Sequence, residues 1–175
     1  MKAQVVYTIG HSTRGADALA ALLLAHGVTS LADVRTVPRS RHNPQFNAES
    51  LAASLATHGI KYARFPGLGG FRRAGPDSPN AGWRNASFRG YADYMQTPAF
   101  AEHLGVLLEL ARNETVAVMC AEAVPWRCHR SLIADALLVR GVRTEEIVSE
   151  LRTTPHELTP FARIEGTKLT YPALA

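Results

Sequence analysis

The residues best suited to covalent chemistry lie together in one stretch, 116–131, which reads VAVMCAEAVPWRCHRS. Its first residues predict a short buried strand that runs out into Cys120, and after a loop Cys128 stands at the start of an apolar helix. A thiolate is a strong nucleophile, and a nearby Arg or protonated His favours the thiolate form. We therefore predict that Cys120 is a nucleophile or thiol carrier, with Arg127 and Arg130 holding an anion beside it.

Three further side chains are candidates for proton transfer in the same site. Glu122 and His129 belong to the stretch itself, and His11 would join them from the N-terminal part of the chain. Carboxylates and imidazoles are the usual general acids and bases of enzymes. Glu122 could instead form an ion pair with Arg127 or Arg130 that only holds the loop.

The two cysteines admit other roles. Cys128 lies near a predicted helix N-terminus, where partial positive charge also favours a thiolate, so Cys120 and Cys128 could form a redox pair. With His129 they offer three metal donors, but zinc sites usually show two tight Cys/His pairs. We therefore predict no metal site, and no cofactor motif is recognised. Either cysteine could also be a small residue that packs beside the buried strand.

Strand-like and helix-like apolar patterns alternate along the chain. Strands are predicted over 5–9, 30–34, 60–65, 116–120 and 146–151. Helices are predicted over 17–26, 47–58, 91–95, 98–112 and 131–140. This order predicts one α/β domain over residues 1–175, a Rossmann-like three-layer fold with a mainly parallel sheet of about five strands and helices on both faces. The tail alternates around Glu165 and Gly166, which predicts a hairpin.

Polar residues follow each of the first four predicted strands. In chain order the candidates are His11, Ser12, Thr13 and Arg14; then Asp33, Arg35 and Arg39; then Gly69, Gly70 and Arg72; then Cys120 and Glu122. Because the carboxyl ends of parallel strands form the ligand crevice of such sheets, we predict that these residues converge there as ligand-binding groups. The turn 11–14 could bind an anion or cap the next helix, and Asp33 with Arg35 could be only an ion-paired edge.

Positive charge is concentrated in the middle third of the chain. Residues 33–91 hold eight Arg and one Lys against three acidic residues, a local charge of +6, whereas the whole chain carries +4. The long loop 66–90 adds aromatic residues, and Tyr91 follows it. Interleaved Arg and aromatic side chains suit phosphates and stacked bases. The loop could therefore contact nucleic acid, act as a lid, or be stapled by its own aromatic residues.

The composition is typical of a globular protein, with 46% hydrophobic and 19% charged residues. No apolar run approaches the ~20 residues that a membrane helix needs, and the N-terminus reads as a strand rather than a signal peptide. Two cysteines are too few for a disulfide framework. We therefore expect a cytoplasmic protein without membrane contact, and the oligomeric state stays open.

Five motifs resemble one known family, the domain-of-unknown-function family numbered 488. They are GHSTR, DVR-x-x-P-R-S, F-x-G-L-G-G, F-R-G-Y-x-x-Y-M and C-A-E-x-x-P-x-x-C-H-R, in this order from about Tyr7 to about Leu151. The resemblance implies a single cytoplasmic α/β domain of a mostly bacterial or archaeal family, with no established reaction.

Three functions follow from these patterns. The first is an enzyme whose cleft binds a phosphate-bearing ligand, a nucleotide or nucleic acid, with Cys120 as nucleophile or carrier; a transferase or a hydrolase would fit. The second is a non-catalytic module that binds nucleotides or nucleic acid. The third is a metal-linked sensor that uses Cys120, Cys128 and His129.

Overall fold

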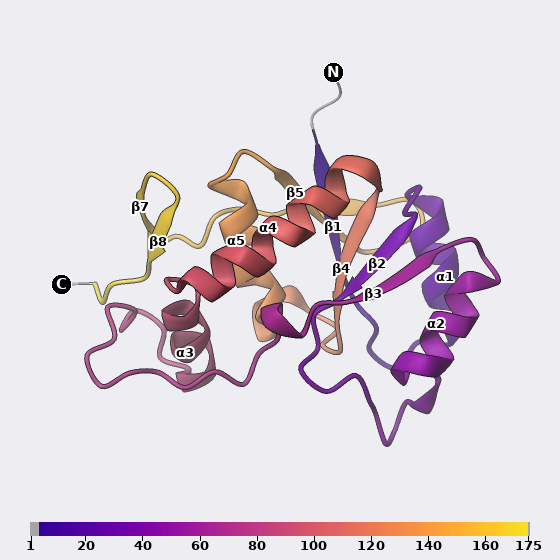
Figure 1. The fold of residues 1–175 in the computed structure, drawn as a ribbon, viewed down its shortest axis with the longest axis horizontal. Coiled ribbons are helices and arrows are strands. Elements are labelled where there is room, and N and C mark those ends of the chain that lie inside the picture. Colours follow the sequence, from indigo (N-terminus) through magenta and orange to yellow (C-terminus); the bar gives the residue numbers. More distant parts are fainter. Residues whose placement is uncertain (1–3, 175) are drawn as a thin grey trace.

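A six-stranded sheet forms the middle of the computed structural model, which describes residues 4–174. Its strands lie in the order β3-β2-β4-β1-β5-β6, and all neighbours are parallel except β5 and β6 (Figure 1). The strands are β1 (Val5–Gly10), β2 (Ser30–Asp33), β3 (Lys61–Arg64), β4 (Val116–Cys120), β5 (Arg143–Ile147) and β6 (Thr153–Pro155). The predicted α/β fold with a mainly parallel sheet is confirmed.

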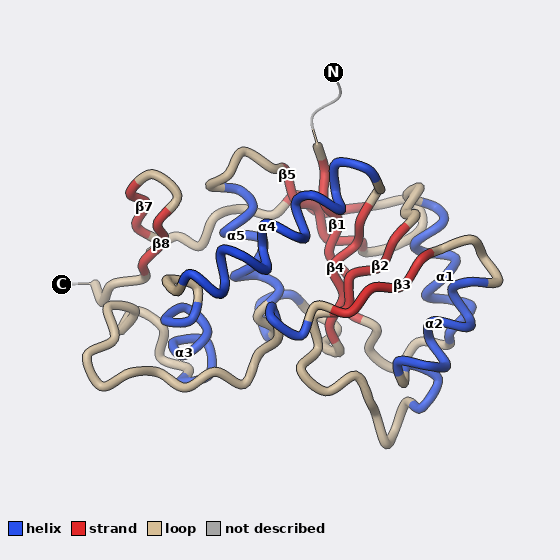
Figure 2. Tube along the Cα trace, viewed as in Figure 1, coloured by secondary structure: helices blue, strands red, loops and turns tan. Residues whose placement is uncertain are grey.

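Helices cover both faces of this sheet (Figure 2). The α-helices are α1 (Ala16–Ala25), α2 (Ala48–Ala56), α3 (Ala86–Tyr94), α4 (Pro98–Asn113) and α5 (Arg130–Leu138), and short 3-10 helices span Pro44–Phe46, Pro66–Leu68 and Pro125–Arg127. Each face of the sheet has its own hydrophobic core. β4 contributes to both, because successive side chains of a strand point to opposite faces. Val118 and Cys120 pack in the core of α4 and α5, whereas Met119 packs with the leucines of α1 and α2.

The strand order brings the first and fourth strands together at their carboxyl ends. β1 pairs with β4 up to Gly10 and Cys120, and β2 lies on the other side of β4. The ladder continues past the strands, since the His11 amide donates to the carbonyl of Cys120 at 2.9 Å. The motifs that follow β1, β2 and β4 therefore meet at one edge of the sheet.

Three elements differ from the sequence prediction. β5 starts at Arg143 and not at 146, because its polar residues pair with β1 near the edge of the parallel part. β6 is an added antiparallel edge strand. α3 starts at Ala86 and not at 91, because the Asn85 side chain accepts hydrogen bonds from the amides of Ser87 and Phe88 and so caps the helix.

The C-terminal segment packs against α5 and ends in the predicted hairpin. The hairpin joins β7 (Arg163–Glu165) to β8 (Lys168–Thr170). Gly166 has a φ of 63°, a left-handed conformation that glycine adopts without strain. The segment is held by Asp135, a buried residue of α5 that accepts hydrogen bonds from His156, Thr159 and Tyr171.

Within residues 4–174, none of the helices has the length and apolar character needed to cross a membrane.

Candidate active site

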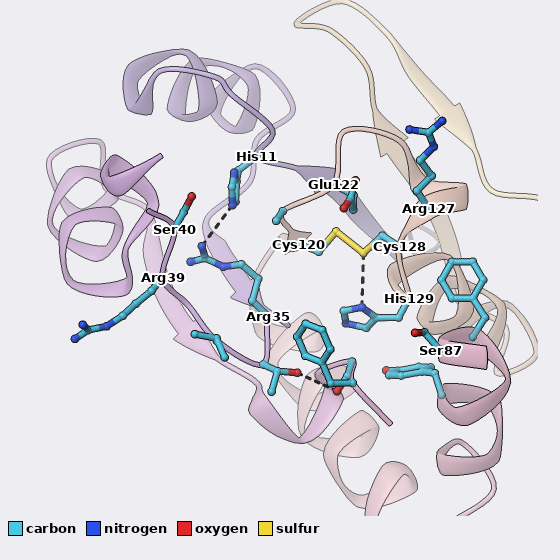
Figure 3. Close-up of a pocket in the computed structure, with 17 residues that line it drawn as sticks. His11, Arg35, Arg39, Ser40, Ser87, Cys120, Glu122, Arg127, Cys128 and His129 are labelled. Atoms are coloured by element: carbon cyan, nitrogen blue, oxygen red, sulfur yellow. Dashed lines mark hydrogen bonds between the residues drawn. A yellow bond between two sulfur atoms is a disulfide. The ribbon is translucent and has the colours of Figure 1, made fainter. Parts of the chain in front are cut away.

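A cavity of about 430 Å³ opens at the carboxyl ends of β1, β2 and β4 (Figure 3). We call it the cleft. Ten of the predicted site residues line it: His11, Arg35, Arg39, Gly70, Tyr91, Cys120, Glu122, Arg127, Cys128 and His129. These residues come from segments that are far apart in the sequence. The structure brings them together at the carboxyl ends of the parallel strands.

The two cysteines form the floor of the cleft. Cys120 ends β4, Cys128 precedes α5, and their sulfurs are joined in a disulfide (Figure 3). Both residues are buried, with exposed fractions of 2% and 5%, although both contribute to the cavity wall. A ligand in the cleft can therefore reach the sulfurs from one side only.

Arg130 lies behind the disulfide and is fully buried. Its Nη1 donates to Cys120 Sγ at 2.7 Å and to the carbonyl of Glu122 at 2.8 Å, and its Nη2 donates to the carbonyl of Ala123 at 3.2 Å. Nε and Nη2 also donate to the carboxylate of Glu146, at 3.3 and 2.7 Å. Together these bonds occupy the five N–H groups of the guanidinium.

The contacts of Arg130 show what it can do. With its donors all engaged, it binds the loop after Cys120 rather than a ligand in the cleft. Its carboxylate partner is Glu146, and it meets Glu122 through the backbone carbonyl alone. A guanidinium hydrogen-bonded to a sulfur stabilises the thiolate once the disulfide is reduced, although the charge of Glu146 offsets part of this effect.

His129 stands beside Cys128 as a neutral imidazole. Its Nε2 lies 3.1 Å from the carbonyl of Val34, and its Nδ1 lies 3.7 Å from Cys128 Sγ. Burial lowers the pKa of His129 to about 4, so the ring is uncharged at neutral pH. Since a carbonyl can only accept, Nε2 carries the proton and Nδ1 presents its lone pair to the sulfur.

His11 and Arg35 form the opposite wall of the cleft. Burial also lowers the pKa of His11, which stacks on Phe46 with ring centroids 4.3 Å apart. Arg35 is paired with Asp33 through Nε and Nη2, at 2.9 and 2.8 Å, and both side chains are buried. Asp33 and Arg35 therefore form a buried ion pair at the end of β2.

One N–H group of Arg35 is not used by the fold. Nη1 carries two N–H groups, and the contact with His11 Nε2 at 3.4 Å engages one of them. No acceptor for the other is found among residues 4–174. Because Arg35 lines the cleft, this group is the one buried cationic donor there that a ligand can use.

The remaining arginines of the site are exposed or engaged elsewhere. Arg39 and Arg127 are exposed at the mouth, and their guanidinium groups point away from the disulfide (Figure 3). Arg72 lies over the ring of Tyr94 at 3.8 Å and donates to the carbonyl of Gly69.

The turn after β1 contributes less to the cleft than predicted. Ser12, Thr13 and Arg14 are not among the described residues that line it. The Ser12 amide donates to the carbonyl of Ala121, which uses a group that an anion would need. N-capping is also wrong for this turn, because Gly15 occupies the N-cap of α1 and no side chain caps the helix.

The loop 66–90 is packed against the C-terminal segment. Trp83 contacts the ring of Phe88 in its own segment and the rings of Phe161 and Tyr171 near the C-terminus, with centroids 4.9 to 5.5 Å apart. Gly70 lies against His129, since an added Cβ would approach Nδ1 to 3.2 Å. Tyr91 donates from its hydroxyl to the carbonyl of Leu68 at 2.8 Å, and burial raises its pKa.

Sequence reasoning missed several residues of the site. Phe71 is 84% exposed at the rim and has a φ of 58°, which is rare for an aromatic residue. Val37, also exposed, and Phe88 add apolar wall. The motifs around these residues were recognised, but nothing in the sequence marks which side chains face the cavity. Glu146, the partner of Arg130, was missed because it was assigned to the start of a strand.

No group of three or more His, Cys, Asp and Glu side chains within residues 4–174 is arranged to hold a metal ion. Cys120, Cys128 and His129, the donors named for the alternative of a metal-linked sensor, are not such a group.

Comparison with known proteins gives one match. A model of the family described as Domain of unknown function DUF488 matches residues 15–137. No curated protein and no solved structure matches the chain.

Proposed function

The chain belongs to the DUF488 family, and we propose that it is an enzyme that performs covalent chemistry with Cys120 on a phosphate-bearing ligand, a nucleotide or nucleic acid, bound in the cleft. The observation that supports this most is the hydrogen bond from Arg130 to Cys120 Sγ. A structural cysteine needs no cationic donor, whereas a nucleophilic one is activated by it.

The residues that line the cleft support the proposal of an anionic ligand with a planar part. The free N–H group of Arg35 offers a donor for a phosphate oxygen, and Arg39 and Arg127 add positive charge at the mouth. Arginine suits phosphate because of its planar, multiply donating group. Phe71 and Phe88 are rings on which a base could stack.

Proton transfer during this chemistry is assigned to Glu122. Glu122 is the only acidic residue among the described residues that line the cleft, and solvent reaches it. It can protonate a leaving group that departs from the adduct on Cys120. His11 is already engaged by Ser12 and Arg35, which makes it a positioning group for Arg35.

The chemistry requires a free thiol at Cys120. We therefore propose that the protein works in a reducing compartment such as the cytoplasm, where the disulfide with Cys128 is opened. In the oxidised form the nucleophile is blocked.

A non-catalytic binding module is the second candidate, and it is supported by Phe71. An aromatic ring that is 84% exposed and lines the same cleft as Arg39 is suited to stacking on a base of a nucleic acid. Such binding should weaken steeply with added salt and should not depend on Cys120.

A thermal-shift screen tests the proposal. Reduced wild type, Cys120→Ser and Arg35→Gln would be compared against nucleotides, sugar phosphates and short oligonucleotides, with Arg163→Gln of the exposed β7 strand as the matched control. We expect a ligand that stabilises wild type and Arg163→Gln but not Arg35→Gln. That ligand should be chemically converted by wild type and not by Cys120→Ser. Binding that survives in Arg35→Gln, or conversion by Cys120→Ser, would refute it.

A further inference from the structure

The two sulfurs in the cleft have different surroundings, and we propose from this that Cys128 is the resolving thiol of Cys120, which gives the protein a thiol–disulfide exchange activity toward small anionic disulfides. The inference rests on the proposed role of Cys120 as the attacking thiolate and adds a second reaction step and a substrate class to it.

Cys120 has the surroundings of the attacking sulfur. Its Sγ accepts a hydrogen bond from the buried guanidinium of Arg130 at 2.7 Å. This contact stabilises negative charge on the sulfur both before an attack and after a bond to it breaks. A cysteine that is held as a thiolate near neutral pH is the one suited to attack an external disulfide.

Cys128 has the surroundings of a thiol that is deprotonated during the reaction. Its Sγ faces the unprotonated Nδ1 of His129 at 3.7 Å and receives the Arg130 amide at 3.5 Å. The ring is held in this orientation by Val34 on one side and by Tyr91 on the other, with the Tyr91 and His129 ring centroids 4.9 Å apart. His129 is thus a hydrogen-bond acceptor positioned for the Cys128 thiol.

The reaction can be written with its atoms and electrons balanced. The Cys120 thiolate attacks a disulfide RS–SR, forms a Cys120–SR mixed disulfide and releases one RS⁻. The Cys128 thiol, which lies against His129 Nδ1, then attacks Cys120 Sγ and gives up its proton. That step forms the Cys120–Cys128 bond and releases the second RS⁻, which takes up the proton. The substrate disulfide is reduced by two electrons, and the two cysteines are oxidised by two.

The cleft selects the kind of disulfide. Both sulfurs face the same cavity, so both leaving groups depart into it. The free N–H group of Arg35 and the guanidinium groups of Arg39 and Arg127 at the mouth favour an R group with a negative charge. On the other side Arg130 contacts Cys120 Sγ, but its other donors are engaged by the loop after Cys120 and by Glu146, so it does not favour one R group over another.

The test uses 5,5′-dithiobis(2-nitrobenzoate), an anionic aromatic disulfide whose released thiolate is coloured. Reduced wild type freed of reductant should release a first and then a second equivalent of the thiolate. It should end as the Cys120–Cys128 disulfide with no adduct by intact mass. Cys128→Ser should release one equivalent and keep the adduct on Cys120.

The role of His129 has a readout of its own. In His129→Gln the second release should slow by about 10-fold relative to the first, the size expected for one lost hydrogen bond. His58→Gln, which removes a histidine far from the cleft, should keep the ratio of the two rates.

Each other outcome overturns a defined part of the account. A wild type that retains adducts on both cysteines, or an unchanged ratio of rates in His129→Gln, removes the resolving role and leaves the proposed function standing. A Cys128→Ser variant in which Cys120 stays unmodified removes both. If disulfide exchange proceeds as expected but the thermal-shift screen finds no phosphate-bearing ligand, this inference stands and the proposal of a phosphate-bearing substrate is refuted.

Discussion

Replacement of Arg130 by Met should destabilise the protein far more than an ordinary surface substitution. Arg130 is fully buried and pairs with Glu146, whose side chain is 12% exposed. The change leaves that carboxylate without its cation and leaves the carbonyls of Glu122 and Ala123 without their donor. Breaking a buried pair by removal of one partner costs about 3–5 kcal/mol.

A matched control is offered by Arg143 in β5, the strand that also contains Glu146. Arg143 pairs with Glu145 at 2.8 Å, but the arginine is 61% exposed. Water screens such a pair, so Arg143→Met should cost less than about 1 kcal/mol. The two variants remove the same functional group from an arginine–glutamate pair and differ chiefly in burial.

Urea denaturation of both variants under reducing conditions measures the difference without a contribution from the disulfide. We expect the midpoint of Arg130→Met to fall well below those of wild type and Arg143→Met. Losses of less than about 1 kcal/mol in both variants would show that Arg130 does not hold the loop after Cys120.

Three other predictions concern His129, Gly10 and the C-terminal segment. The pKa of His129 is about 4 in the folded protein and about 6.5 in an unfolded chain, so stability should fall by up to about 3 kcal/mol as pH drops from 6.5 to 4. Urea melts of His129→Gln should show a shallower loss in this window, and an equal loss would contradict the burial argument. Gly10→Ala should cost about 3 kcal/mol because its Cβ would collide with the backbone of Glu122, whereas Gly105→Ala, with open space on a helix, should stabilise by about 1 kcal/mol. Asp135→Asn should weaken the attachment of the C-terminal segment, which faster amide exchange over residues 156–171 would report and unchanged exchange would refute.

Most residues of the site could be predicted from the order of strands and polar residues along the chain. His11, Arg35 and Cys120 each follow a strand, and parallel strands deliver their carboxyl ends to one edge whatever their exact limits. The order of the strands could not be predicted, because the connections from β1 to β2 and from β4 to β5 each pass over a neighbouring strand. The contact between His11 and Cys120 depends on that order.

Arg130 shows where sequence reasoning stopped short. It shares a helical face with Ile133 and Leu137, three and seven positions later, and both are fully buried. That spacing predicts an inward side chain for Arg130, and the structure has it buried rather than facing a ligand. Its partner Glu146 could not be found in the same way, because ion pairs between distant segments leave no local pattern.

The central claim is that Arg130 makes Cys120 a reactive thiolate in the cleft. The most direct measurement is the rate of iodoacetamide alkylation of Cys120 at neutral pH, in reduced Cys128→Ser with and without Arg130→Met, scaled to the rate of both unfolded proteins. The account predicts that Cys120 reacts faster in the folded Cys128→Ser protein than in its unfolded chain, and that Arg130→Met abolishes this advantage. Equal or slower reaction in the folded protein with Arg130 in place would contradict it.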